Sequence, residues 1–201
     1  MDFIISLPQL QALYGTPGQA AQLKVMHHLV PTYRQFVERS RFCVLTTVGP
    51  GGTDGTPRGD AGPVVTVLDD RTLALPDWRG NDRIDSLTNI VVDGRVSLIF
   101  LIPGSTNAMR VNGTARLTVD GDLRDQLARG GTRPRSVIVI TIAEVYPQCA
   151  RALIRSELWT NGDASQGLPS IGAMLAEVTS GAFDGAAYDA EWPGRAAKTM
   201  W

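Results

Sequence analysis

The chain has few of the residues that build metal centres and disulfide frameworks. Its 201 residues include two cysteines, Cys43 and Cys149, and two adjacent histidines, His27 and His28. A zinc site needs four ligands at close spacing, and neighbouring side chains on a helix point about 100° apart. We therefore expect no metal site, and we expect both cysteines to be reduced core residues of a cytoplasmic protein.

Long apolar runs and an excess of charge are also missing. The densest apolar run, Val96–Ile102, is far shorter than the roughly 18 residues that a membrane-spanning helix needs. The 19 basic and 20 acidic residues leave a net charge of −1, which predicts no broad basic surface for nucleic acid. The first residues include Asp2 and no basic stretch, so we expect no secretory signal. Together these features predict a cytoplasmic protein that binds neither nucleic acid nor a membrane.

The common nucleotide and hydrolase motifs do not occur after an expected strand. These motifs are the Gly-x-Ser-x-Gly elbow, the P-loop lysine motif and Gly-x-Gly-x-x-Gly. The stretch Gly49-Pro50-Gly51-Gly52 is followed by no helix, so we interpret it as a flexible hairpin loop rather than a phosphate cradle.

What is present is a set of strands between two helical ends. Proline and glycine punctuation predicts short helices before residue 42, and helical spacing predicts further helices near 82–92 and 147–159. Residues 49–56 are expected to form a glycine-rich turn. β-Branched residues and alternation predict six strands, at Phe42–Val48, Val64–Leu68, Arg71–Pro76, Val96–Ile102, Arg110–Val119 and Val137–Ile142.

This order predicts an α+β protein, mainly β, built as a six-stranded antiparallel barrel with flanking helices. We expect one domain over 1–201, with helices in 1–41, the barrel in 42–146 and a helical segment in 147–201. The runs Val96–Ile102 and Val137–Ile142 are apolar almost throughout, which is typical of strands buried on both faces. The barrel interior covers one face of these strands, so something else must cover the outer face. Helices or a homodimer interface could do so, and we favour the dimer.

Three clusters could bind an anion, and each has a plainer interpretation. Arg58 offers a planar fork beside flexible glycines, or it forms only a local surface pair with Asp60. Arg79, Asn81 and Arg83 lie at an expected helix start, which is an anion site or a helix capped by Asn81 or Asp82. The third cluster is a column of residues four apart, which would bind a flat anion or merely cover the surface: Arg151, Arg155 and Trp159.

Taken together, these segments resemble the pyridoxamine 5′-phosphate oxidase-like flavoproteins, the FMN-binding split barrels. The resemblance spans roughly residues 30–159, and it is greatest to the bacterial subgroup that carries Pro-Arg-Gly-Asp. It rests on Phe42–Thr47, Thr56–Asp60, Leu68–Asp77, Gly80–Ile90, Val96–Gly104, Arg110–Gly113 and Cys149–Ser156.

The resemblance implies a Greek-key split barrel that forms a homodimer with two FMN molecules at the interface. It places Arg58 at the flavin-facing strand, Arg83 at the FMN phosphate, and Leu75, Pro76 and Asp77 against the ring system and ribityl chain. The expected cofactor-binding residues are Arg58, Gly59, Asp60, Leu75, Pro76, Asp77, Asn81, Arg83, Ser86, Arg155 and Trp159.

The chain departs from the authentic oxidase at residues that the oxidase uses. Pro63-Val64 stands where the oxidase has a lysine, Ala108 stands where it has a glutamine, and no histidine follows His28. We therefore expect an FMN-dependent oxidoreductase of another small molecule, with no catalytic side chain assigned. The alternatives are a flavin carrier or sensor, or a split barrel that binds deazaflavin F420 or haem. The C-terminal Met174, Trp192 and Trp201 would fold over the flavin or pack on the barrel.

Overall fold

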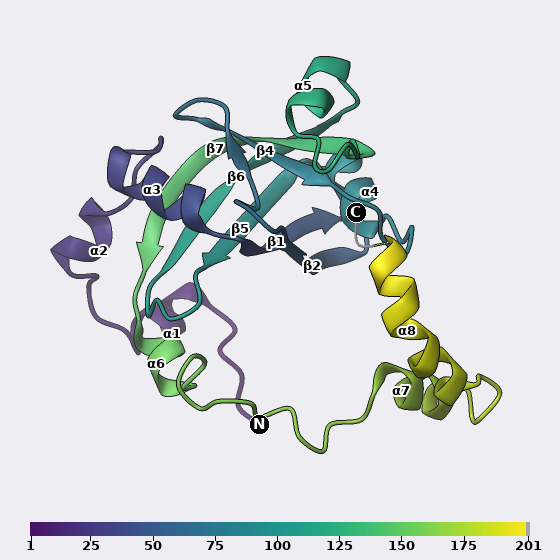
Figure 1. Ribbon diagram of the computed structural model, residues 1–201. Helices are drawn as coiled ribbons and strands as arrows, with labels where there is room; N and C mark the ends of the chain where they lie inside the picture. The colour runs from purple at the N-terminus through teal and green to yellow at the C-terminus, as the bar shows by residue number, and fades with distance from the viewer. Residues whose placement is uncertain (200–201) are drawn as a thin grey trace.

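The computed structural model describes residues 1–199, and its centre is one antiparallel sheet that curls into a split barrel (Figure 1). Hydrogen bonding joins the strands in the order β2-β1-β5-β6-β7-β4-β3, so β2 and β3 are the two edges. The strands are β1 (Phe42–Gly49), β2 (Gly52–Gly59), β3 (Thr66–Val67), β4 (Thr72–Asp77), β5 (Arg95–Leu101), β6 (Ala108–Thr118) and β7 (Ser136–Gln148).

The α+β class and the antiparallel barrel are confirmed, with seven strands in place of six. The additional strand is β2, which lies where a glycine-rich turn was expected over 49–56. The turn itself is only Gly49–Gly52, and Gly52 adopts a φ of 112° that suits glycine. Glycine, threonine and Pro57 give β2 little strand signal, yet an edge strand tolerates them because one side needs no ladder bonds.

The barrel interior is filled by alternate side chains of the central strands. On β5, Val96, Leu98 and Phe100 point inward and are buried. Within one chain the outer face of this strand is only partly covered, because Ile99 is 38% exposed. The outer face of β7 is covered within the chain, because helix α5 (Gly121–Gln126) packs Leu123 against it.

Short helices precede the barrel, as expected, and one more closes its end. Ser6 caps the first helix by accepting the N–H of Gln9, and Pro31 begins the third. Helix α4 packs its buried Ile90 against the core near β1. These helices are α1 (Leu7–Gln11), α2 (Gln19–Leu23), α3 (Pro31–Arg39) and α4 (Asp85–Val92).

The helix expected over 147–159 is mostly absent. Strand β7 continues to Gln148 because it pairs with β6 as far as Ala108, and only α6 (Arg151–Arg155) is helical. Glu157 adopts a φ of 50°, which turns the chain away before Trp159. The expected column of Arg151, Arg155 and Trp159 is therefore broken after Arg155.

The C-terminal part forms a separate pair of helices, α7 (Ile171–Val178) and α8 (Gly185–Thr199). Figure 1 shows them at the lower right, joined to the barrel by the long segment after α6, while the far end of α8 returns toward β2. Gly172 and Gly185 let the two backbones meet, and the Asp189 carboxylate accepts hydrogen bonds from the Gly172 N–H at 2.9 Å and from the Ser170 hydroxyl. The expectation for Trp201 concerns a residue outside 1–199.

The two cysteines lie in different surroundings. Cys43 is buried on β1, and desolvation raises the pKa of its thiol to about 12, with Arg58 opposing the shift. Cys149 is exposed beyond the end of β7, so the expectation of a core position is wrong for this residue. No helix within residues 1–199 has the length and apolar character needed to cross a membrane.

Candidate functional site

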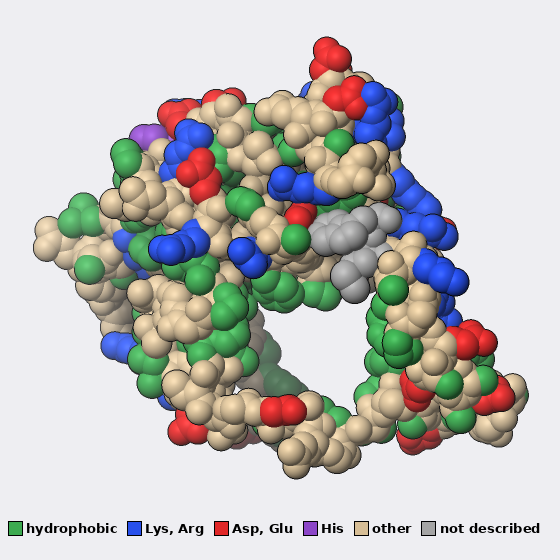
Figure 2. All heavy atoms as spheres, viewed as in Figure 1, with side chains coloured by type: hydrophobic (Ala, Val, Ile, Leu, Met, Phe, Trp, Pro, Cys, Tyr) green, Lys and Arg blue, Asp and Glu red, His purple; other side chains and the backbone are tan. Residues whose placement is uncertain are grey.

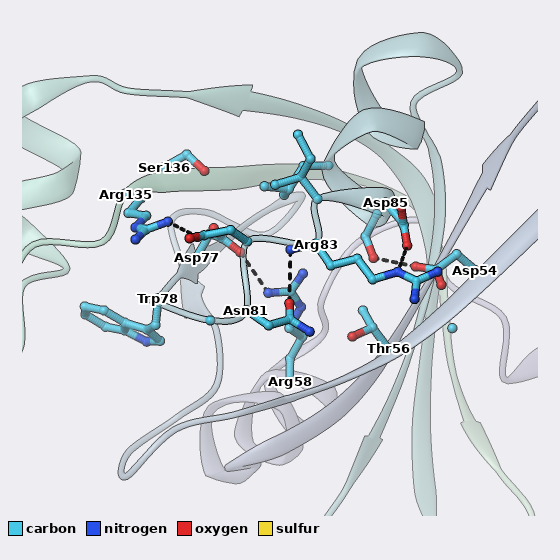
Figure 3. A pocket seen from close by; sticks show the side chains of 16 residues that line it. Asp54, Thr56, Arg58, Asp77, Trp78, Asn81, Arg83, Asp85, Arg135 and Ser136 are labelled. Atoms are coloured by element: carbon cyan, nitrogen blue, oxygen red, sulfur yellow. Dashed lines mark hydrogen bonds and ion pairs between the residues drawn. The ribbon is translucent and has the colours of Figure 1, made fainter. Parts of the chain in front are cut away.

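A cleft opens where β2 and β4 end beside the start of α4 (Figure 3). Its volume is about 390 Å³, and a second cavity of about 540 Å³ adjoins it. Arg58, Trp78 and Gly80 line both cavities, so the two adjoin at these residues. Each volume lies within the range of small-molecule sites.

Strand β2 supplies one wall of the cleft by simple alternation. Asp54, Thr56 and Arg58 are two residues apart, so they face the same side of the strand, and all three line the cleft. Arg58 lies opposite the inward-facing Cys43 of β1, which directs its side chain toward the inner side of the sheet.

Arg58 forms an ion pair across the cleft rather than with its near neighbour. Its Nη1 donates to Asp77 at 2.8 Å, and both side chains are largely buried. The alternative of a local Arg58–Asp60 pair is therefore wrong. The Nε of Arg58 is buried and has no hydrogen-bond partner among residues 1–199. A buried charged donor without a partner is costly, so this atom is the clearest sign of a missing acceptor.

Asp60 lines the second cavity, where its buried carboxylate holds the loop together. Its carboxylate is 1% exposed and accepts the indole N–H of Trp78 and the backbone N–H of Gly62, both at 3.2 Å. The Arg129 Nε lies 3.9 Å away. Asp60 thus fixes Trp78, which in turn lines both cavities.

The loop before α4 adopts its own turn rather than a standard helix cap. Asn81 accepts the backbone N–H of Arg83 at 3.1 Å, and Asp82 adopts a φ of 59°. Because the chain turns here, the helix begins at Asp85 with Ile84 as the preceding residue, and no side chain caps it. The alternative that Asn81 or Asp82 caps the helix is wrong: no side chain caps the first turn of α4, and its residues Asp85, Ser86 and Leu87 line the cleft.

Arg83 also has an acidic partner. Its Nε donates to Asp85 at 2.5 Å, and this hydrogen bond raises the pKa of the already basic guanidinium further. The side chain is 79% exposed, so it can rotate away from Asp85 at little cost. Next to it, the Ser86 hydroxyl donates to Asp54 at 2.6 Å.

The electrostatic balance of the cleft is therefore close to even. Figure 3 shows guanidinium groups that project inward from separate elements, each beside a carboxylate. A phosphate in the cleft would have to displace these carboxylates from their arginines. Otherwise it would accept hydrogen bonds from Arg58 Nε and from the backbone amides of α4. The pairs are Arg58 with Asp77, Arg83 with Asp85, and Arg135 with Asp82.

Most of the expected site residues come together in the two cavities. Arg58 and Arg83 share the cleft, as expected. Arg155 and Trp159 lie elsewhere in the chain: α6 is at the lower left of Figure 1, far from α4, and the Trp159 indole donates to the Ser105 carbonyl at 2.8 Å. The residues brought together are Arg58, Gly59, Asp60, Leu75, Pro76, Asp77, Asn81, Arg83 and Ser86.

Several residues of the cleft were not anticipated. Alternation with Arg58 could have pointed to Asp54 and Thr56, since they share its face of β2. Arg135 and Ser136 reach the cleft only because β7 pairs with β4, where Asp77 lies opposite Ser136. No local pattern in the sequence signals that pairing.

The sequence profile of the pyridoxamine 5′-phosphate oxidase family matches residues 29–149. The chain belongs to this family. The match covers the barrel and the cleft and ends before α6, so the C-terminal helices of this family member lie outside it. Among curated protein sequences, none matches the chain.

Solved structures are similar to the chain at low sequence identity. HupZ of Group A Streptococcus is 15% identical, covers 60% of this chain and 94% of its own, and superposes with a TM-score of 0.50. An FMN-binding protein from Syntrophomonas wolfei is 16% identical, with coverages of 57% and 86% and a TM-score of 0.43. A protein related to general stress protein 26, from Clostridium acetobutylicum, is 14% identical, with coverages of 59% and 86% and a TM-score of 0.45.

Proposed function

We propose that the cleft binds FMN and that the protein is an FMN-dependent oxidoreductase acting on a small molecule. The observation that carries the proposal is the buried, unpartnered Nε of Arg58 in the same cleft as the uncapped start of α4. Arg58 and the first residues of α4 line the same cleft, and donors of these two kinds suit a phosphate. Membership of the pyridoxamine 5′-phosphate oxidase family supports this assignment.

The lining residues divide naturally between the two ends of such a cofactor. Arg58, the first-turn amides of α4 and a rotated Arg83 would hold the phosphate. Leu75 and Pro76, which line the adjoining cavity beside Trp78, would lie against the ring system. Each charge-assisted hydrogen bond to the phosphate contributes about 1.5–3 kcal/mol, so a few of them suffice for tight binding.

When bound, FMN supplies the transfer of hydride or of single electrons between two substrates. The residues of the chain bind and orient it and exclude water from one side of the ring system. The carboxylates of the cleft are already engaged, Asp77 and Asp85 with arginines and Asp54 with Ser86. None of these groups is therefore assigned as a general base.

The decisive experiment is an FMN titration of the purified chain with riboflavin as the matched ligand. We expect uptake of one FMN per chain, with an oxidised-flavin spectrum that dithionite bleaches. Riboflavin lacks the phosphate, so it should bind at least about tenfold more weakly, since 1.4 kcal/mol is a factor of ten. Failure to take up FMN, equal affinity for both ligands, or a haem or deazaflavin spectrum in the isolated protein would overturn the proposal.

We also propose that the protein is a homodimer joined through the outer face of β1 and β5. Phe42 and Ile99 on this face are 37% and 38% exposed, although the strands around them are strongly apolar. Pairing would supply the second cover that β5 lacks within one chain.

Ile99→Asp tests this interface, because Ile99 is partly exposed and its replacement should leave the barrel folded. We expect the parent chain to have twice the monomer mass by light scattering and Ile99→Asp to be monomeric. Val119→Asp, at an apolar position that is 68% exposed beyond β6, is the matched control and should remain dimeric. A monomeric parent protein, or a dimer that survives Ile99→Asp, would count against the proposal.

A further inference from the structure

A third cavity lies beside the cleft, between the loop after β4 and the C-terminal helix α8. Its volume is about 490 Å³. Gly80 and Asn81 line both this cavity and the cleft, so the two are neighbours that meet at this loop. The other wall comes from Tyr188, Trp192 and Arg195 of α8.

Arg195 is held in an unusual way for a surface arginine. Its guanidinium carbon lies 4.2 Å from the ring centroid of Tyr188 and 5.5 Å from that of Trp192. Both distances are within the range of a cation–π contact, so the two rings hold the guanidinium at this position. Its Nη2 is buried and has no hydrogen-bond partner within residues 1–199, so a fixed, charged donor lacks an acceptor.

The charge of this cavity differs from that of the cleft. Arg79 and Arg195 line it, and among residues 1–199 neither has a carboxylate within 4.0 Å, although the cleft arginines are paired. Asp189, on the same helix, is already engaged with Ser170 and Gly172. Figure 2 shows basic side chains gathered along the right-hand edge of the molecule, down to the upper end of α8.

We propose that this cavity is the subsite for the second substrate and that it takes a planar aromatic acid. A fixed guanidinium matches the two oxygens of a carboxylate, and the exposed indole of Trp192 offers a face on which a flat ring stacks. The assignment to a second substrate rests on the proposed function of the neighbouring cleft. The subsite is made partly by α8, beyond the residues that the family profile matches, so its specificity is a property of this chain.

The test is calorimetric titration of the full chain, with and without FMN, using benzoate as the probe. Benzamide and cyclohexanecarboxylate are matched probes that lack the charge and the flat ring, respectively, and both should bind at least several-fold more weakly. Comparing the affinity for phenyl phosphate with that for benzoate shows whether the cavity prefers a phosphate or a carboxylate. We expect Arg195→Gln to weaken benzoate binding about tenfold or more, because it removes a charge-assisted hydrogen bond.

Two further variants show whether a loss of benzoate binding in Arg195→Gln comes from the cavity or from misfolding. Trp192→Leu alters a side chain that is 54% exposed, so it should fold normally and still weaken benzoate binding. Lys198→Gln removes a charge from the same helix outside the cavity lining and should change nothing. FMN affinity should be unaffected in all three variants.

The two ways of failing are distinguishable. If the parent protein does not bind benzoate, or if Arg195→Gln and Trp192→Leu bind it as tightly as the parent, the subsite is refuted while FMN uptake still supports the cleft. If benzoate binding depends on Arg195 but FMN is not taken up, the acid-binding cavity stands and its role as a second-substrate subsite is refuted.

Discussion

Arg58→Gln is expected to lower FMN affinity about tenfold to a hundredfold and to destabilise the fold by about 1–3 kcal/mol. The loss of affinity follows because Arg58 Nε is the buried donor without a partner in the cleft. The loss of stability follows because the Asp77 carboxylate, 13% exposed, would lose its ion-pair partner. Flavin titration and denaturant unfolding measure the two effects separately.

A double variant separates the structural role of Arg58 from its binding role. Arg58→Gln with Asp77→Asn removes the stranded charge, so it should recover part of the lost stability without recovering FMN affinity. Arg116→Gln, an exposed arginine of β6 outside the cleft lining, is the control and should change neither quantity. An Arg58→Gln protein that binds FMN as tightly as the parent would contradict the assignment of the phosphate to this cleft.

Gly185→Ala is expected to separate α7 from α8. A β-carbon at Gly185 would overlap the backbone carbonyl of Gly172, and neither backbone can yield without breaking the close approach of the helices. Overpacking of this kind costs about 1–3 kcal/mol. Because only the far end of α8 approaches the barrel, at the loop after β4, we expect the loss to be local. Hydrogen exchange of α7 and α8 should accelerate about tenfold or more, while exchange in the barrel stays unchanged.

The matched control lies in the same helix. A β-carbon at Gly194 would meet nothing within 4 Å, so Gly194→Ala should leave the helix pair intact and stabilise α8 by up to about 1 kcal/mol. Equal exchange rates in Gly185→Ala and Gly194→Ala would show that the close contact does not hold the helices together.

The parts of the fold that could be predicted are those with a strong local pattern. The alternation and the apolar runs predicted β5, β6 and β7, and helical spacing predicted α4 to within a few residues of its start. Strand β2 was missed because its glycines, threonines and Pro57 resemble a turn, and its pairing with β1 alone makes it a strand. The helix expected over 147–159 failed for the same reason, since pairing with β6 kept its first residues extended.

The sequence analysis identified arginines of the site, but it did not predict which carboxylates form ion pairs with them. The resemblance to the flavoprotein family assigned Arg58 and Arg83 to one ligand, and the structure places both in one cleft. The partner of Arg58 depends on which strand ends lie together, and that is set by the pairing of β4 with β7 and β2 with β1. The contribution of α8 depends on how a distant helix docks, which no spacing in the sequence reports.

The ion pair between Arg58 and Asp77 makes the cleft selective before any ligand arrives. Asp77 holds the guanidinium in place, so a ligand does not have to immobilise a flexible side chain when it binds. The same carboxylate competes with any anion for the guanidinium of Arg58. A monoanion such as chloride would bind Arg58 too weakly to displace Asp77. In the proposed FMN complex the phosphate ester offers several strongly accepting oxygens to Arg58 and to the start of α4 together, whereas a chloride ion is a single acceptor.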